Sequence, residues 1–283
     1  MTRIGRTAQG APAGPVLVTG VSSGIGRATA LHLATRGFPT LGVLRTEDDV
    51  DELERTARAA DVRIEPIVLD VADTRACADT VSGMELYGLV NNAGFYNVGT
   101  VEDVPVADVR RQFDTMVIGP MQLARHALPG MRARGGGRIV NVSTSMVHLS
   151  LALTGWYQAS NHALSAVGDA LRMEVASSGV EVITIEPGAI GTQIWRKAEH
   201  DLYRRRPGSR YAPSYDRALR ILHTLEDRIH PPEVVAEVIG TALTVRRPRV
   251  RYQAGREVAL LRAAGVVLPR RVRDLAVRTV LSL

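Results

Sequence analysis

The sequence of 283 residues contains one cysteine, Cys77, and one lysine, Lys197. A single cysteine excludes a disulfide within the chain and is typical of a reducing compartment, so we expect a cytoplasmic location. No apolar run reaches the roughly 18 residues that a membrane span needs. The first residues lack the apolar stretch of a signal peptide and are rich in Arg, Gly, Ala and Pro, which predicts a flexible tail over 1–14.

Acidic residues are outnumbered, and the net charge is +6, almost all of it from arginine. A basic balance suits nucleic acid or an anionic membrane. However, the arginines are dispersed except near 204–210 and 246–278, and only 4% of residues are aromatic, so no platform for stacking bases is apparent. We therefore expect no nucleic-acid partner and a small molecule as the ligand.

What the sequence does contain is a regular alternation of strand-like and helix-like runs. Strands are predicted at 16–20, 39–44, 63–70, 86–94, 137–143, 180–188 and 249–253. This rhythm indicates parallel strands joined by right-handed helical crossovers, and the apolar runs suit a sheet covered on both faces. The sequence predicts a single α/β domain with a doubly wound parallel sheet of about seven strands.

Two segments depart from this rhythm. Residues 189–230 are rich in Arg, Tyr and His, and they follow a strand at the sheet edge where ligands bind, so we interpret them as a flexible flap over the substrate. Four aromatic residues of the flap either line a pocket or pack the flap onto the body: Trp195, Tyr203, Tyr211 and Tyr215. The last segment, 255–283, is predicted to form a helical extension.

A glycine-rich loop joins the first strand to the first helix. Glycine permits the tight turn, and it lets backbone N–H groups and a helix N-terminus reach a pyrophosphate. This context predicts a dinucleotide site formed by Gly20, Ser22, Ser23, Gly24, Ile25 and Gly26. The second strand ends at Arg45 and Thr46, without the acidic residue that accepts the ribose hydroxyls of NAD(H). Because arginine pairs well with a 2′-phosphate, we predict NADP(H) in preference to NAD(H).

Four motifs in order together resemble the short-chain dehydrogenase/reductase family: TGVSSGIG at 19–26, NNAG at 91–94, YQASNHAL from Tyr157, and PGAIGT at 187–192. The resemblance covers about 15–254, and the region from 246 is similar to the hydroxysteroid- and retinol-dehydrogenase-like branch. It implies a Rossmann fold, a dimer or tetramer, and a larger set of cofactor-binding residues: Asp70 and Val71 at the adenine, Asn92, Ala93 and Gly94 at the ribose, and Pro187, Gly188 and Thr192 at the nicotinamide.

The catalytic positions match this family less well. Its Asn–Ser–Tyr–Lys tetrad falls here on Met116, Thr144, Tyr157 and Asn161, with Ser143 beside Thr144. The resemblance implies that the missing lysine would hold the nicotinamide ribose and lower the pKa of the tyrosine. Without that cation, a phenol near its free pKa of about 10 leaves roughly 0.1% phenolate at pH 7.

A neutral phenol is a poor base and a serviceable acid, so we expect any redox activity at neutral pH to favour carbonyl reduction. His148 lies between Thr144 and Tyr157 in the sequence and is a further candidate acid or base. Lys197 lies on the flap, where lysines are usually solvated.

These observations leave three functions open. The first is an NADP(H)-dependent reductase of a carbonyl on a mid-sized apolar molecule, with Tyr157 as proton donor. The second is a non-redox isomerase, lyase or cyclase with a structural nucleotide, and the third is a nucleotide-binding protein without catalysis. No spacing of His, Cys, Asp or Glu indicates a metal.

The C-terminal run from Leu268 is amphipathic and basic. Val272, Leu275 and Thr279 continue the apolar stripe at helical spacing, with arginines among them. The stripe would suit an anionic membrane surface, but packing on the body or across an interface between copies is the favoured interpretation.

Overall fold

The computed structural model describes residues 14–225, 229–255 and 257–283. Of the predicted tail, residues 1–13 lie outside this described part. Seven parallel strands form one sheet in the order β3-β2-β1-β4-β5-β6-β7. Their bounds are β1 Val16–Thr19, β2 Thr40–Leu44, β3 Ile64–Val68, β4 Gly88–Asn91, β5 Gly137–Val142, β6 Val180–Pro187 and β7 Arg251–Ala254. The predicted doubly wound α/β fold is confirmed.

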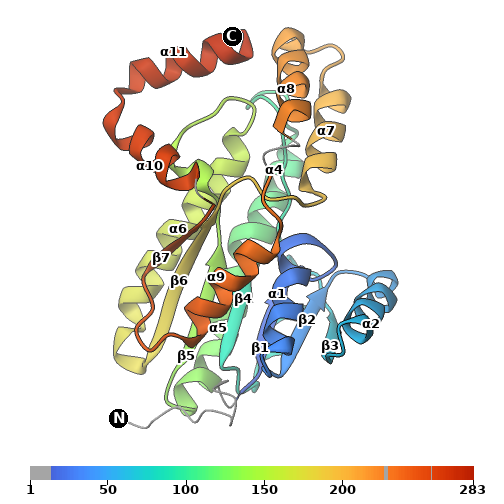
Figure 1. Ribbon diagram of the computed structural model, residues 1–283, viewed down its shortest axis with the longest axis vertical. Helices are drawn as coiled ribbons and strands as arrows, with labels where there is room; N and C mark the ends of the chain where they lie inside the picture. Colours follow the sequence, from blue (N-terminus) through green and yellow to red (C-terminus); the bar gives the residue numbers. More distant parts are fainter. Residues whose placement is uncertain (1–13, 226–228, 256) are drawn as a thin grey trace.

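Helices cover both faces of the sheet (Figure 1). One apolar core joins the strands to α1 (Gly24–Thr35), α2 (Val50–Ala59) and α9 (Glu233–Thr244). The other core joins them to α3 (Thr74–Val81), α5 (Gly119–Ala133) and α6 (Gly155–Glu174). The residues of β1 and β4 are all buried, as expected for strands covered on both sides.

The strand order reverses between β1 and β4. From β1 the chain moves outward through β2 and β3, and it then returns to β4 on the other side of β1. Crossovers diverge at such a point and leave a crevice at the carboxyl ends of the strands, where ligands of open α/β sheets bind. The glycine-rich loop follows β1 directly into this crevice.

The predicted flap is built from two helices, α7 (Ile194–Arg205) and α8 (Ala212–Leu225), which lie beyond the carboxyl ends of the strands (Figure 1). Tyr215 is fully buried, donates a hydrogen bond to the Asp103 carboxylate at 2.9 Å and accepts one from the Thr100 N–H at 3.1 Å. This part of the flap is therefore fixed to the loop before α4 (Val106–Phe113).

The extension forms α10 (Glu257–Val267) and α11 (Arg270–Leu281), which lie at the same end of the molecule as the flap (Figure 1). Val277 and Leu281 of α11 join the apolar cluster of the flap. Leu268, Val272 and Leu275 are 42%, 49% and 64% exposed, so this stripe does not pack on the body of its own chain, and packing across an interface between copies stays a prediction. Among the described residues, no helix is both long and apolar enough to span a bilayer.

Candidate cofactor and active site

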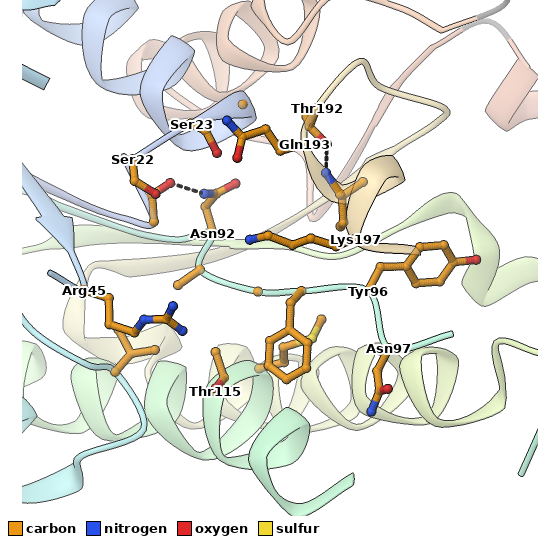
Figure 2. A pocket seen from close by; sticks show the side chains of 18 of the residues that line it. Ser22, Ser23, Arg45, Asn92, Tyr96, Asn97, Thr115, Thr192, Gln193 and Lys197 are labelled. Carbon is orange, nitrogen blue, oxygen red and sulfur yellow. Dashed lines mark hydrogen bonds between the residues drawn. The ribbon is translucent and has the colours of Figure 1, made fainter. Parts of the chain in front are cut away.

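A cavity of about 700 Å³ opens at the carboxyl ends of the strands, between the glycine-rich loop and α7 (Figure 2). This volume is within the range of ligand pockets, roughly 300–1,000 Å³. Residues after β1, β2, β4 and β5 line it, together with α6 and the start of the flap. The cavity thus gathers side chains that are far apart in the sequence at one edge of the sheet.

The glycine-rich loop has the backbone shape of an anion-binding cradle. Gly20 and Gly24 have φ of +74° and +56°, and a Cβ on Gly20 would lie 2.9 Å from the Ala93 Cα. Ser22, Ser23, Gly24 and Ile25 line the cavity with Gly20. Gly26 lies behind the loop, where a Cβ would collide with the Gly20 carbonyl oxygen. Ser23 occupies the N-cap of α1 without a side-chain capping bond, so the first N–H groups are not used by it.

Arg45 follows β2 and lines the cavity, and Figure 2 shows its guanidinium on the same side of α7 as Ser22 and Asn92. Thr46 does not line the cavity, and its hydroxyl donates to the Asp49 carboxylate at 2.9 Å. Asp70 and Val71 both line the cavity, and the Asp70 carboxylate accepts a hydrogen bond from the Ala72 N–H at 3.0 Å.

The NNAG segment at the end of β4 is hydrogen-bonded to the end of β1. The Asn92 amide donates to the Thr19 carbonyl at 2.8 Å, and the Thr19 hydroxyl accepts from the Asn92 and Ala93 N–H groups at 2.9 Å each. These bonds place Asn92, Ala93 and Gly94 on the cavity wall. The Asn92 side chain therefore stabilises the start of the glycine-rich loop.

Of the PGAIGT motif at 187–192, only Thr192 lines the cavity. Pro187 ends β6, and the Gly188 N–H donates to the Ala254 carbonyl at 2.8 Å. Neither residue lines the cavity, so their place at the nicotinamide stays a prediction.

Tyr157 lies in the first turn of α6 and lines the cavity, with the ring of Tyr96 against it at 4.6 Å between centroids. Loss of solvation is the largest influence on the phenol and raises the pKa of Tyr157 above its ordinary value. Hydrogen bonding from Thr144 and Asn161 opposes this shift of the pKa and is the weaker effect. Thr144 and Asn161 are both buried. The structure thus brings two predicted polar side chains, Thr144 and Asn161, together beside the phenol of Tyr157.

Two buried oxygens beside this phenol have no protein partner. The Asn161 amide nitrogen donates to the Tyr157 carbonyl at 2.9 Å, while its Oδ1 and the Ser143 Oγ have no hydrogen-bond partner among the described residues. Both residues line the cavity. Since buried polar atoms are normally paired, these oxygens, together with the glycine cradle, fit a ligand that carries hydroxyl and phosphate groups.

Comparison with known proteins agrees with this geometry. The family model described as short chain dehydrogenase matches residues 15–202. The chain belongs to the short-chain dehydrogenase family.

Several members of the family are similar over nearly the whole chain. The NADPH-dependent 3-dehydrocapnine reductase of Ornithobacterium rhinotracheale is 30% identical, over 91% of this chain and 94% of the relative. Retinol dehydrogenase 7 of Mus musculus is 30% identical, over 87% of this chain and 81% of the relative. The structure of L-sorbose reductase from Gluconobacter frateurii with NADPH and L-sorbose has a TM-score of 0.71 and 25% identity, over 90% of this chain and 98% of that one.

Met116 stands at the position where the family resemblance implies an asparagine. It lies in a π-helical turn, Asp114–Ile118, between α4 and α5. Its sulfur accepts from the Ser160 hydroxyl at 3.8 Å and from the Gln112 amide at 3.7 Å, and it packs near Gly94. A thioether has no proton to pass on, so this position fills space in this short-chain dehydrogenase.

The structure places His148 away from the cavity wall. It lies in the 3-10 turn Ser145–His148, and its Nε2 is 2.8 Å from Glu186, whose carboxylate is almost fully buried and also accepts from Arg251 at 3.0 Å. His148 thus pairs with a buried carboxylate and does not line this cavity, and its role as an acid or base stays a prediction.

The flap contributes charged side chains to the cavity. The four aromatic residues of the flap, for which the sequence left a pocket-lining role open, do not contribute. None of those four lines it, whereas Lys197, His200, Arg204 and Arg205 do. Arg204 and Arg205 are paired with Asp108 and Asp201. Lys197 is the one residue of this group with a signal in the sequence, since it is the only lysine of the chain. No cluster of metal-binding side chains occurs in the described ranges.

Proposed function

We propose that this protein is an NADP(H)-dependent carbonyl reductase in which Tyr157 donates the proton. The observation that carries the proposal is the environment of Tyr157. Its phenol has a raised pKa and lies beside the side chains of Thr144 and Asn161. It lines a cavity whose other end is formed by the glycine-rich loop.

The cofactor choice rests on Arg45. Its guanidinium is exposed at the end of β2 and has no ion-pair partner among the described residues. Arginine binds a terminal phosphate through paired N–H groups, whereas it offers a ribose diol no acceptor. The NADPH dependence of the similar reductase from Ornithobacterium rhinotracheale agrees with this choice.

In the proposed reaction, the bound cofactor supplies a hydride to the carbonyl carbon. The developing alkoxide needs a proton, and the neutral Tyr157 hydroxyl is placed to give it. The Thr144 hydroxyl hydrogen-bonds the phenol and can orient the carbonyl oxygen beside it. The Asn161 Oδ1 is free to accept a ribose hydroxyl, which positions the cofactor without adding charge.

The substrate end of the cavity is partly apolar. Phe95, Tyr96, Val142 and Leu164 line the cavity, and the ring of Tyr96 contacts Tyr157. This wall suits a mid-sized apolar ketone or aldehyde, and the raised pKa of Tyr157 favours reduction over oxidation at neutral pH.

The direct experiment follows NADPH absorbance with a panel of apolar ketones and aldehydes at pH 7. We expect turnover by the unmodified protein, and a loss of about 100-fold or more in kcat in Tyr157→Phe, the scale of one general acid. Tyr203→Phe, on an exposed face of α7, is the matched control and should retain full activity.

Tight NADPH binding with no turnover of any carbonyl would contradict the reductase. That result would favour a non-redox enzyme or a silent nucleotide-binding protein on this scaffold. If the protein bound neither NADPH nor NADH, the proposal of a nucleotide site would itself be contradicted.

A further inference from the structure

The only lysine of the chain lies at the cavity. Lys197 is on the exposed side of α7, and Figure 2 shows its side chain extended into the cavity towards the side where Ser22, Ser23 and Asn92 lie. Its position is that of a cation facing the glycine cradle.

The ammonium of Lys197 is not used by the protein. Two carboxylates of the cavity lining on the flap and α4 side, Asp201 and Asp108, are both paired with Arg204 and Arg205. Lys197 itself forms no ion pair or side-chain hydrogen bond in the described part of the chain. A cation left unpaired opposite a row of backbone N–H groups makes an electropositive space between them.

Lys197 does not replace the lysine missing at Asn161. The groups that shift the pKa of Tyr157 are its burial, Thr144 and Asn161, and no cation is among them. In Figure 2 the ammonium end of Lys197 points away from Tyr96, whose ring contacts Tyr157. The charge of Lys197 therefore lies towards the phosphate-binding side of the cavity and not beside the phenol of Tyr157.

Resting on the proposed nucleotide site, we propose that Lys197 is a second phosphate-binding element, which binds the pyrophosphate of the dinucleotide from the flap. The glycine loop holds the phosphates from below, Arg45 pairs with the 2′-phosphate at one end, and Lys197 closes the site from α7.

The first test compares the affinities of NADPH and NADH, measured by calorimetry. Lys197→Met should weaken both nucleotides by the same factor, roughly 10-fold to 100-fold for one charged hydrogen bond, because both carry the pyrophosphate. Arg45→Ala should weaken NADPH alone. Lys197→Arg should restore most of the affinity. Arg132→Met, which removes one exposed charge at the opposite edge of the sheet, should bind like the unmodified protein.

The second test uses the uniqueness of this lysine. Acetylation, followed by peptide mass spectrometry, reports the reactivity of one ε-amino group, with the α-amino group as internal reference. Saturating NADPH or NADH should slow modification of Lys197 by about 10-fold or more, because an ammonium bound to phosphate is not free to react.

Unchanged nucleotide affinity in Lys197→Met would overturn the inference, and so would unchanged reactivity of Lys197 with bound nucleotide. An altered pH dependence of turnover with unaltered affinity would do the same, since it would place the charge at the phenol. If the unmodified protein binds neither nucleotide, the proposed function fails; if it binds and Lys197→Met binds equally well, only the present inference fails.

Discussion

At the scale of single residues, the buried side chain of Tyr157 lies beside an uncharged side chain, that of Asn161. Asn161 keeps the spacing of four on α6 and the contact with Tyr157, yet its amide carries no charge. Burial then dominates and raises the pKa of the phenol. The arrangement keeps Tyr157 protonated, which is the state that a proton donor requires.

Replacing Asn161 by lysine tests this electrostatic argument. A cation one turn from Tyr157 should lower the pKa of the phenol, so the pH at which alcohol oxidation begins should fall by about one to three units. The pH profile of kcat/KM for both directions measures the shift. A profile identical to that of the unmodified protein would contradict the role given to burial.

Cys77 provides an independent check on the buried core. It is fully buried in α3, and burial raises the pKa of its thiol to about 11. Because the thiolate is the reactive form, we expect a chromogenic disulfide reagent to modify Cys77 at neutral pH only after unfolding. Stoichiometric reaction of the native protein within seconds would show that the α3 side of the core opens readily.

At the scale of elements, the packing of α1 against α9 contains a titratable group. Gly240 of α9 leaves room for the His32 ring, and a Cβ there would lie 2.5 Å from the His32 Nε2. Burial, then the charge of Arg36, lowers the pKa of His32, and Glu237 opposes this less strongly. His32 is thus held neutral between two helices that support the glycine loop.

The sign of the resulting pH dependence is fixed by linkage. A histidine with a lowered pKa in the folded state binds its proton more readily when unfolded, so stability is full above the unfolded value of about 6.5 and falls as the pH drops below it. Urea midpoints between about pH 7.5 and 5.5 should show this fall. His32→Gln should flatten it, whereas His162→Gln, at an exposed position of α6, should not.

At the scale of the whole molecule, the flap and the C-terminal extension share one end. Leu281 of α11 packs with Tyr215 and Leu219 of α8 in one apolar cluster, while the outer stripe of α11 remains exposed. Helix α11 is therefore held by one face only, and its stability depends on the flap helix against which it packs.

Substitutions of two leucines of α11, one buried and one exposed, distinguish its packed face from its exposed face. Leu281→Ala should cost about 2 kcal/mol or more and open α11 and α8 to hydrogen exchange, because it removes a buried contact. Leu275→Ala, at an exposed position, should change the free energy of unfolding by less than about 0.5 kcal/mol. Equal effects of the two substitutions would mean that the outer stripe is covered in solution.

The sequence by itself determined the sheet, the crossovers, the glycine cradle and the family, because each depends on local periodicity or on residues adjacent in the chain. It also placed Thr144, Tyr157 and Asn161 in their motifs, since the last two share one helical turn. Only the tertiary structure decided that His148 pairs with the buried Glu186, that Thr46, Pro187 and Gly188 do not line the cavity, and that Lys197 points into it. Those outcomes depend on which way separate elements turn their faces when they pack, and no local pattern encodes that orientation.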